Sequence, residues 1–161
     1  MDRIWAPWRT VYIGKDQPPG CVFCEKQKSD RDAENYVLYR GDKTFVMLNL
    51  YPYNNGHLLI LPKRHVGELE ELEPDELMEL GLVTQKMVGL MKIAFQPEGF
   101  NVGANLGKVA GTGIPGHFHI HVVPRWGGDT NFMPVIGDVR VLSEGLEHTF
   151  KKLIKAMENH S

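Results

Sequence analysis

The apolar residues of this 161-residue chain change their spacing along its length, and each change predicts a new element. Residues 36–40 (YVLYR) and 44–50 (TFVMLNL) are short apolar runs separated by a Gly-Asp turn, which predicts a β-hairpin. Residues 57–61 (HLLIL) form a third run, which ends at a proline and predicts another strand.

A helical spacing replaces the short runs in the middle of the chain. Leu77, Leu80 and Met87 lie three and seven residues apart, so they would share one face of a helix. Pro74 suits the first turn, and the acidic residues after it suit a helix N-terminus. We therefore predict a helix over residues 74–95, although each of its two glycines costs about 1 kcal/mol relative to alanine.

The remaining pattern predicts two more strands, residues 99–105 and 117–124, and a second helix, residues 143–158. The two strands are joined by residues 107–116 (GKVAGTGIPG), a loop with four glycines. Residues 1–20 end in QPPG and predict an extended segment. The order of strands, helix, strands and helix predicts an α+β fold, in which an antiparallel sheet carries two main helices on one side.

Composition narrows the class of protein. The chain is 42% hydrophobic and 24% charged, with a formal net charge of -2, which argues against a protein that coats DNA or RNA. No apolar stretch is long enough for a membrane span, and the N-terminus lacks the apolar core of a signal peptide. With two cysteines there is no disulfide framework. We expect one cytoplasmic domain that binds neither nucleic acid nor membrane.

Candidate chemistry is concentrated in HFHIHVV, residues 117–123. Side chains two apart on a strand share a face, so His117, His119 and His121 would line one side, with the apolar residues between them facing the core. A core would not favour three titratable rings where aliphatic side chains pack better. The row therefore indicates a functional site.

Two kinds of chemistry fit such a row. Histidines on a strand can bind a catalytic zinc that keeps one position open for water. Alternatively, one imidazole can be a nucleophile while its neighbours orient it and handle protons. The glycine-rich loop before the row, with Lys108, and Arg125 after it favour phosphate chemistry, because glycine lets backbone N–H groups approach an anion.

These residues carry a resemblance to a known family. HFHIHVV resembles the His-φ-His-φ-His-φ-φ signature of the histidine triad (HIT) superfamily of nucleotide hydrolases and transferases. MLNLYPYNNGHLLILPKRHV is similar to the family's upstream strand-turn-strand, and the Asn-x-Gly…Ala-Gly loop also fits, so the resemblance covers residues 20 to 132. HVVPRWGGDTNF, IWAPWR and CVFC look most like the bacterial branch that contains diadenosine tetraphosphate phosphorylases.

The resemblance implies a HIT-like fold, one HIT domain over residues 1–161, and a homodimer with a continuous sheet. It implies that His119 is the nucleophile, which attacks the α-phosphorus to give a nucleotidyl-histidine intermediate. His121 would contact the phosphate or the bridging oxygen, and His57 would support the triad. Imidazole suits this role because it is largely neutral near pH 7.

The resemblance also implies a set of substrate-binding residues. The family's usual Ala-Gly-Gln is changed in this loop, so which atom contacts the phosphate is left open. Besides His121, the set consists of Asn49 at the ribose hydroxyls, Asn105, Gly111, Thr112 and Gly113 in the phosphate loop, and Trp126 at the mouth of the site.

The cysteine pair CVFC indicates metal or redox chemistry. A redox pair is expected at a helix start just after a strand, and QPPG precedes this pair instead. By resemblance to zinc-binding family members and to the related galactose-1-phosphate uridylyltransferases, His65 and His117 would join Cys21 and Cys24 in a structural zinc site. No organic cofactor is expected.

The expected enzyme cleaves dinucleoside polyphosphates, diadenosine tetraphosphate above all, with inorganic phosphate or water as acceptor and a purine mononucleotide among the products. Alternatives within the family are a dinucleoside polyphosphate hydrolase and a purine nucleoside phosphoramidase. An alternative of another class is a nucleotide-binding module without significant turnover.

Overall fold

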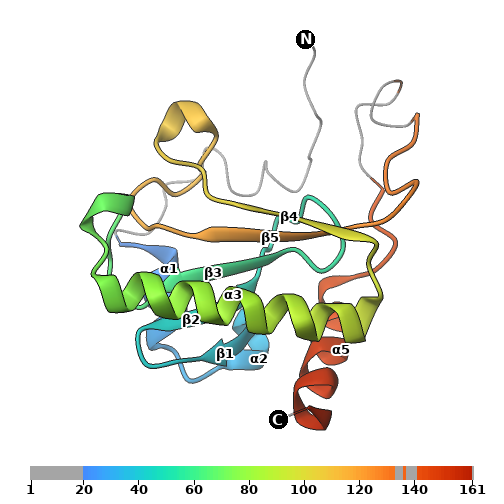
Figure 1. Cartoon of the computed structure of the whole chain (residues 1–161), viewed down its shortest axis with the longest axis horizontal. Helices are drawn as coiled ribbons and strands as arrows, with labels where there is room; N and C mark the ends of the chain where they lie inside the picture. The colour runs from blue at the N-terminus through green and yellow to red at the C-terminus, as the bar shows by residue number, and fades with distance from the viewer. Residues whose placement is uncertain (1–19, 133–135, 137–140, 161) are drawn as a thin grey trace.

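A computed structural model describes residues 20–132, 136 and 141–160 (Figure 1). These residues contain one antiparallel sheet in the order β1-β2-β3-β5-β4. Its strands are β1 (Val37–Arg40), β2 (Thr44–Leu48), β3 (Leu58–Pro62), β4 (Gly99–Gly103) and β5 (Ile120–Arg125). The predicted α+β class is confirmed.

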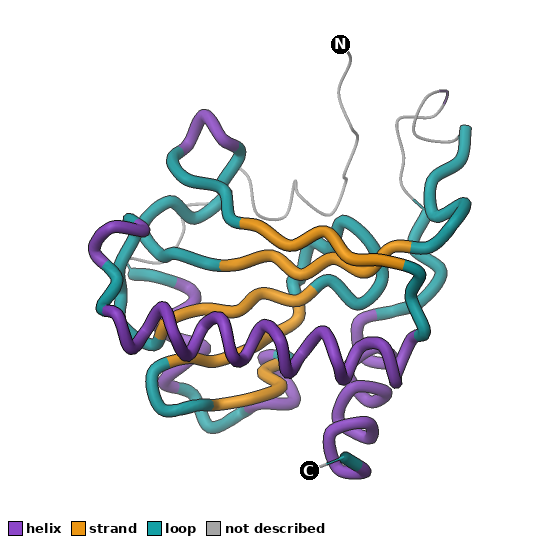
Figure 2. Tube along the Cα trace, in the orientation of Figure 1, coloured by secondary structure: helices purple, strands orange, loops and turns teal. Residues whose placement is uncertain are grey.

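Two main helices pack on one face of the sheet. Figure 2 shows the strands running side by side behind the long helix α3 (Pro74–Phe95), and α5 (Leu146–Asn159) packs beside it. The shorter elements are α1 (Val22–Lys28), α2 (Asp32–Asn35) and the 3-10 turns η2 (Leu69–Glu71) and η3 (Lys108–Ala110). None of the described helices is long and apolar enough to cross a membrane.

The central strands have apolar side chains on both faces. In β2, Val46 packs in the core beneath α3, whereas Phe45 packs in a smaller cluster on the opposite face. Phe23 of α1 joins that smaller cluster, so α1 covers the face that α3 leaves open. The two predicted main helices thus lie on one side, and α1, which was not predicted, lies on the other. Both core faces of β2 and β3 are buried, which explains why these strands read as continuous apolar runs.

Element boundaries follow local chemistry. The predicted helix over 74–95 is observed with the same limits, because Glu73 and Glu76 form a capping box at its start and Gln96 ends it in a left-handed conformation. The C-terminal helix begins three residues later than predicted, with Gly145 as its N-cap.

The predicted strand over 117–124 is shorter at its start. β5 begins at Ile120, because the ladder with β3 ends at the pair Ile60–Ile120. Ahead of it, the backbone N–H of Phe118 donates instead to the carbonyl of Val66, at 2.7 Å. β4 likewise ends at Gly103, two residues short of the predicted limit. Apart from Gly20, the expected extended segment over residues 1–20 lies outside the described residues, and a single domain over residues 1–161 stays a prediction.

Candidate active site and metal centre

The three histidines lie at the start of β5, on the face of the sheet that α1 covers; we call this the histidine face. His121 pairs with Leu59 of β3, which belongs to the cluster on this face. Phe118 and Val122 belong to the opposite core beneath α3. The predicted alternation is thus observed, even though the first two histidines precede the strand proper.

The proton on His119 is positioned by the backbone. Nδ1 of His119 lies 2.8 Å from the carbonyl oxygen of His117, and since a carbonyl only accepts, Nδ1 carries the proton. The lone pair is therefore on Nε2. Burial lowers the pKa of His119, which favours the neutral ring. A neutral imidazole with a free Nε2 lone pair is a competent nucleophile.

A second chain of hydrogen bonds sets the proton of His121. The backbone N–H of Tyr53 donates to Nδ1 of His57 at 3.0 Å, so that nitrogen accepts and the ring proton is on Nε2. Nε2 of His57 lies 2.9 Å from Nδ1 of His121 and donates to it. His121 is consequently protonated on Nε2. Burial, together with the charge of His119, lowers the pKa of His121 to about 4, so the ring is neutral near pH 7.

The two ring nitrogens Nε2 therefore have opposite character. Nε2 of His119 is a lone-pair donor, and Nε2 of His121 is a hydrogen-bond donor on a ring whose centroid lies 4.9 Å away. The latter nitrogen is buried and has no hydrogen-bond partner among the described residues. An unpaired buried donor beside a nucleophile suits a ligand that brings its own acceptor oxygen.

Asn49 lies beside this chain of hydrogen bonds. Its Oδ1 accepts from the backbone N–H of Tyr51 at 2.9 Å, and its Nδ2 lies 3.3 Å from Nδ1 of His57. The structure thus brings together His57, His119, His121 and Asn49, which the sequence placed in three separate segments.

The glycine loop returns to the histidine face. Gly103 of β4 pairs with His121, so the chain beyond it, including half-buried Asn105, runs toward His119. At the far end of the loop, Ile114 packs against the apolar cluster on the histidine face.

Within the loop, Gly107 and Gly111 flank η3 with φ of 79° and 95°, backbone that other residues rarely adopt. Thr112 is half-buried, and Gly113 is exposed. Their contacts with a phosphate stay a prediction.

Trp126 lies elsewhere. It follows the C-terminal end of β5, whereas His119 precedes its start. At roughly 3.3 Å per residue, the strand separates Trp126 from His119 by on the order of 20 Å. Its backbone N–H donates to Oδ2 of Asp129 at 3.2 Å. The structure does not bring Trp126 to the histidines of its own chain.

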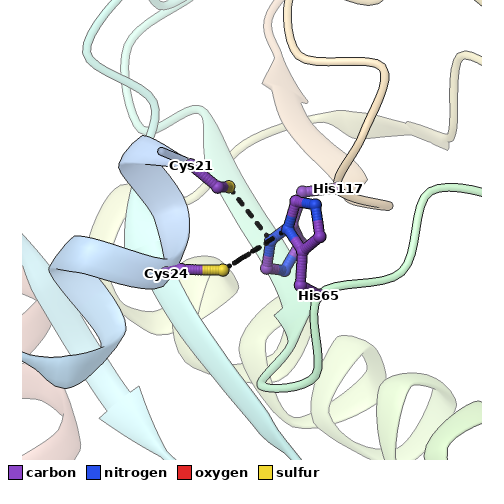
Figure 3. A group of neighbouring side chains, drawn as sticks. All are labelled: Cys21, Cys24, His65 and His117. Carbon is purple, nitrogen blue, oxygen red and sulfur yellow. Dashed lines mark hydrogen bonds between the residues drawn. The ribbon is translucent and has the colours of Figure 1, made fainter. Parts of the chain in front are cut away.

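Four side chains converge at the other end of the row (Figure 3). The ligand atoms of Cys21, Cys24, His65 and His117 all lie within 4.8 Å of one another. Sγ of Cys21 is 3.3 Å from Nδ1 of His117, and Sγ of Cys24 is 3.4 Å from Nδ1 of His65. Donor atoms bound at about 2.0–2.3 Å around a tetrahedral zinc lie a comparable distance apart, so the group fits the metal.

Proton positions at this group also fit a metal. Nε2 of His117 donates to the carbonyl oxygen of Pro62 at 2.8 Å, which leaves the lone pair on Nδ1, facing the sulfurs. This is the arrangement in which a backbone carbonyl orients a metal-binding histidine. Burial, aided by Cys21, raises the pKa of Cys24, and a bound cation would offset this by favouring the thiolate.

The cysteine pair lies at the start of α1, with Cys21 as its N-cap residue. A helix start was not predicted there, because the two prolines and the glycine just before VFCEKQK are typical of irregular structure. No strand can be placed before the pair, since the described residues begin at Gly20.

Sequence reasoning missed two aromatic residues of the site. Phe23 lies between the cysteines in the sequence. The centroid of its ring is 5.5 Å from that of His117, which it meets edge-on, and 5.4 Å from that of His119. The ring of Tyr53 lies against those of His57 and His121. Their positions within CVFC and four residues before His57 were the only signals. The contacts of Phe23 with the histidines, and of Tyr53 with His121, join segments far apart in the sequence.

Comparisons with known proteins identify the family of the chain. The HIT domain family matches residues 30–128, and the chain belongs to this family. It is 43% identical to an AP-4-A phosphorylase of Mycobacterium tuberculosis over 95% of this chain and 83% of that protein. An asymmetrical bis(5'-nucleosyl)-tetraphosphatase of Schizosaccharomyces pombe is 35% identical over 55% of this chain and 48% of its own length.

Solved structures share the fold. A Zn-bound histidine triad family protein from Mycobacterium smegmatis superimposes with a TM-score of 0.71 and 27% identity, covering 87% of this chain and 94% of that one. A hypothetical histidine triad nucleotide-binding protein from Sulfolobus tokodaii gives a TM-score of 0.70 and 31% identity, covering 86% and 93%. The expected HIT-like fold is confirmed.

Proposed function

We propose that the protein is a dinucleoside polyphosphate phosphorylase that acts on diadenosine tetraphosphate through a nucleotidyl intermediate on His119. The observation that carries this proposal is the opposite character of the two Nε2 atoms, a lone pair on His119 beside an N–H on His121. The similarity to the AP-4-A phosphorylase over most of both chains supports the substrate.

In the first step, Nε2 of His119 attacks the α-phosphorus, and the bond from that phosphorus to the bridging oxygen breaks. ATP leaves, and AMP stays bound through a new N–P bond. The N–H of His121 donates to the bridging oxygen as negative charge develops on it. His57 is a positioning residue here, because it holds His121 in the tautomer that can donate.

In the second step, an oxygen of inorganic phosphate attacks the same phosphorus and releases ADP, which restores His119. Water in place of phosphate would release AMP. The overall reaction converts one diadenosine tetraphosphate and one phosphate into ATP and ADP.

The substrate-binding residues keep the roles that the family resemblance gave them. Asn49 would bind the ribose through the hydrogen bonds that its side-chain amide can form besides its contacts with Tyr51 and His57. The loop residues Asn105, Gly111, Thr112 and Gly113 would surround the phosphates with N–H groups. Trp126, at the far end of β5, would contact only a distant part of a long dinucleotide or the site of a second subunit.

The metal centre would hold a structural zinc through Cys21, Cys24, His65 and His117. Bound zinc would supply a cross-link between α1, the segment after β3 and the start of β5. No reaction step needs it, since His119 and His121 stay free of the metal. The catalytic-zinc alternative would use the whole histidine row, and the donor set found here does not include its second and third members.

A homodimer with a continuous sheet stays part of the proposal. Among the described strands, β4 pairs only with β5, so its other edge is open, and Val102 on it is half exposed. On α3, Met78, Leu82 and Ile93 are exposed apolar side chains. Covering such an edge and such a helix with a second copy would remove both from water. A cytoplasmic location also stays a prediction.

The test is incubation with diadenosine tetraphosphate, with and without inorganic phosphate, followed by identification of the nucleotides. ATP and ADP formed only with phosphate would support the phosphorylase. ATP and AMP formed without phosphate would favour the hydrolase. The similarity to the asymmetrical tetraphosphatase also supports that alternative. Nucleotide binding without turnover would favour the binding module, and turnover only of nucleoside phosphoramidates would favour the phosphoramidase.

A further inference from the structure

Tyr53 touches both supporting histidines of the site, through its backbone and its ring. Its N–H donates to Nδ1 of His57 at 3.0 Å. Its ring centroid lies 4.5 Å from that of His57, and 5.5 Å from that of His121 with only 20° between the planes.

The contact between the rings of Tyr53 and His121 would stabilise the hydrogen bond between His57 and His121. In the described part of the chain, Nδ1 of His121 has one hydrogen-bond partner, Nε2 of His57, and the geometry of this bond depends on the plane of the His121 ring. Rotation of that ring about its Cβ–Cγ bond would carry Nδ1 away from His57 and turn the Nε2–H away from its place beside His119. A flat ring stacked on His121 opposes this rotation and keeps water from the bond.

The segment that carries Tyr53 is itself held in place. The next residue, Asn54, is buried and donates to the carbonyl oxygen of Pro124 at 3.0 Å and to Oδ2 of Asp129 at 2.8 Å. Gly56 has φ of 77°, and a Cβ there would lie about 3.1 Å from the ring of Phe95. The turn is therefore packed against the far end of β5, which gives the Tyr53 ring a rigid support.

We propose that Tyr53 is a positioning residue, whose ring holds His121 in the plane and tautomer that present its N–H to the reacting phosphate. It acts through His121 and His57 rather than on the substrate. This inference rests on the proposed function for its kinetic consequence. Its structural part, the state of the His121 ring, is independent of any reaction.

Three substitutions separate the ring, the hydroxyl and bulk packing. Tyr53→Leu removes the stack and keeps the backbone N–H; Tyr53→Phe removes only the hydroxyl. Tyr53→Met keeps a long side chain without an aromatic face, and it serves if the leucine variant folds poorly. Tyr39→Leu is a distant control for the loss of a half-buried tyrosine, because Tyr39 packs on the α3 side beneath Lys86.

The first measurement is the tautomer of His121 by ¹⁵N NMR on the full chain without substrate. The wild type and Tyr53→Phe should show a single tautomer protonated on Nε2, and Tyr53→Leu and Tyr53→Met should show a mixture. A single unchanged tautomer in both non-aromatic variants would overturn the proposal, whatever the activity of the protein.

The second measurement is the steady-state kinetics with diadenosine tetraphosphate and phosphate. Loss of the stack should lower kcat by on the order of 10-fold or more with little change in KM, because it misplaces a reacting group. Phenylalanine should restore kcat. If Tyr53→Phe instead loses as much as Tyr53→Leu and KM rises, the hydroxyl binds substrate and the positioning role is wrong. If the wild type does not turn over this substrate, the proposed function fails while the NMR result still decides the inference.

Discussion

The carbonyl oxygen of His117 accepts a hydrogen bond from Nδ1 of His119 at 2.8 Å, while the ring of His117 faces the two cysteines. His117 thus joins the proposed metal centre by its side chain and the proposed nucleophile, His119, by its backbone. Phe23, which lies between the cysteines, contacts both rings. The proposed metal centre and the proposed nucleophile therefore lie side by side and both contact His117 and Phe23.

Loss of a bound zinc should lower the activity, because His117 connects the metal group to His119. In Cys21→Ser, we expect loss of bound zinc, a lower melting temperature and a kcat reduced several-fold, because the His117 backbone is less firmly held. Metal content by mass spectrometry, thermal unfolding and kinetics would be measured together. Asp30→Ala, an exposed change just beyond the same helix, is the control. Full activity and stability in a metal-free Cys21→Ser protein would contradict this coupling.

Arg40 should control metal affinity from outside the centre. Its guanidinium pairs with Asp32 at 2.6 Å and donates to the backbone carbonyl oxygens of Lys26, Gln27 and Ser29, at the end of α1. Arg40→Met should loosen the helix that presents both cysteines and weaken zinc binding by roughly 10-fold, in the range known for supporting partners of metal ligands. Competition with a chelator measures this. The exposed pair of Arg31 with Glu34 offers a control, Arg31→Ala, which should leave the affinity unchanged.

His57→Phe should damage catalysis more than binding. The change keeps a ring of similar shape but leaves Nδ1 of His121 without its donor, so its tautomer is no longer fixed. A buried acceptor without a partner costs about 1–3 kcal/mol. We expect a lower free energy of unfolding and a kcat reduced by roughly 100-fold, typical of a lost acid–base contribution. A variant with unchanged kcat would remove His57 from the mechanism.

The stability of the fold should fall in mild acid because of His121. Its pKa is near 6.5 in the unfolded chain and lowered to about 4 in the folded one, so between these values the unfolded state binds more protons. Stability therefore decreases as the pH falls from 6.5 toward 4. Urea unfolding across this range should show a weaker pH dependence for His121→Asn than for the wild type. Equal slopes for the two proteins would contradict the burial of a neutral His121.

Local patterns predicted part of this structure well. The apolar spacing predicted α3 within its observed limits, although Leu77 is 43% exposed and does not share the buried face of Leu80 and Met87. The alternation of HFHIHVV predicted which side chains share a face. The metal group was reached through resemblance, because nothing in the spacing of Cys24 and His65 shows that they meet.

What the sequence could not reveal depends on distant backbone. α1 was not predicted because two prolines come just before it in the sequence. It packs on the histidine face because Phe23 contacts strands far along the chain. The tautomers of His57 and His121 follow from a turn whose N–H groups take their positions only in the folded chain. The separation of Trp126 from His119 likewise required the direction and length of β5.

The proposed mechanism requires His119 to form the covalent bond to the nucleotide. The most direct measurement mixes the protein with diadenosine tetraphosphate in the absence of phosphate. The reaction is stopped with a neutral denaturant, because an N–P bond is labile in acid, and the protein is analysed by mass spectrometry. We expect one AMP group on the peptide that contains His119 and no adduct in His119→Ala. When phosphate is added before the quench, the AMP group should be lost with release of ADP. An adduct on another residue, or turnover that survives in His119→Ala, would contradict it.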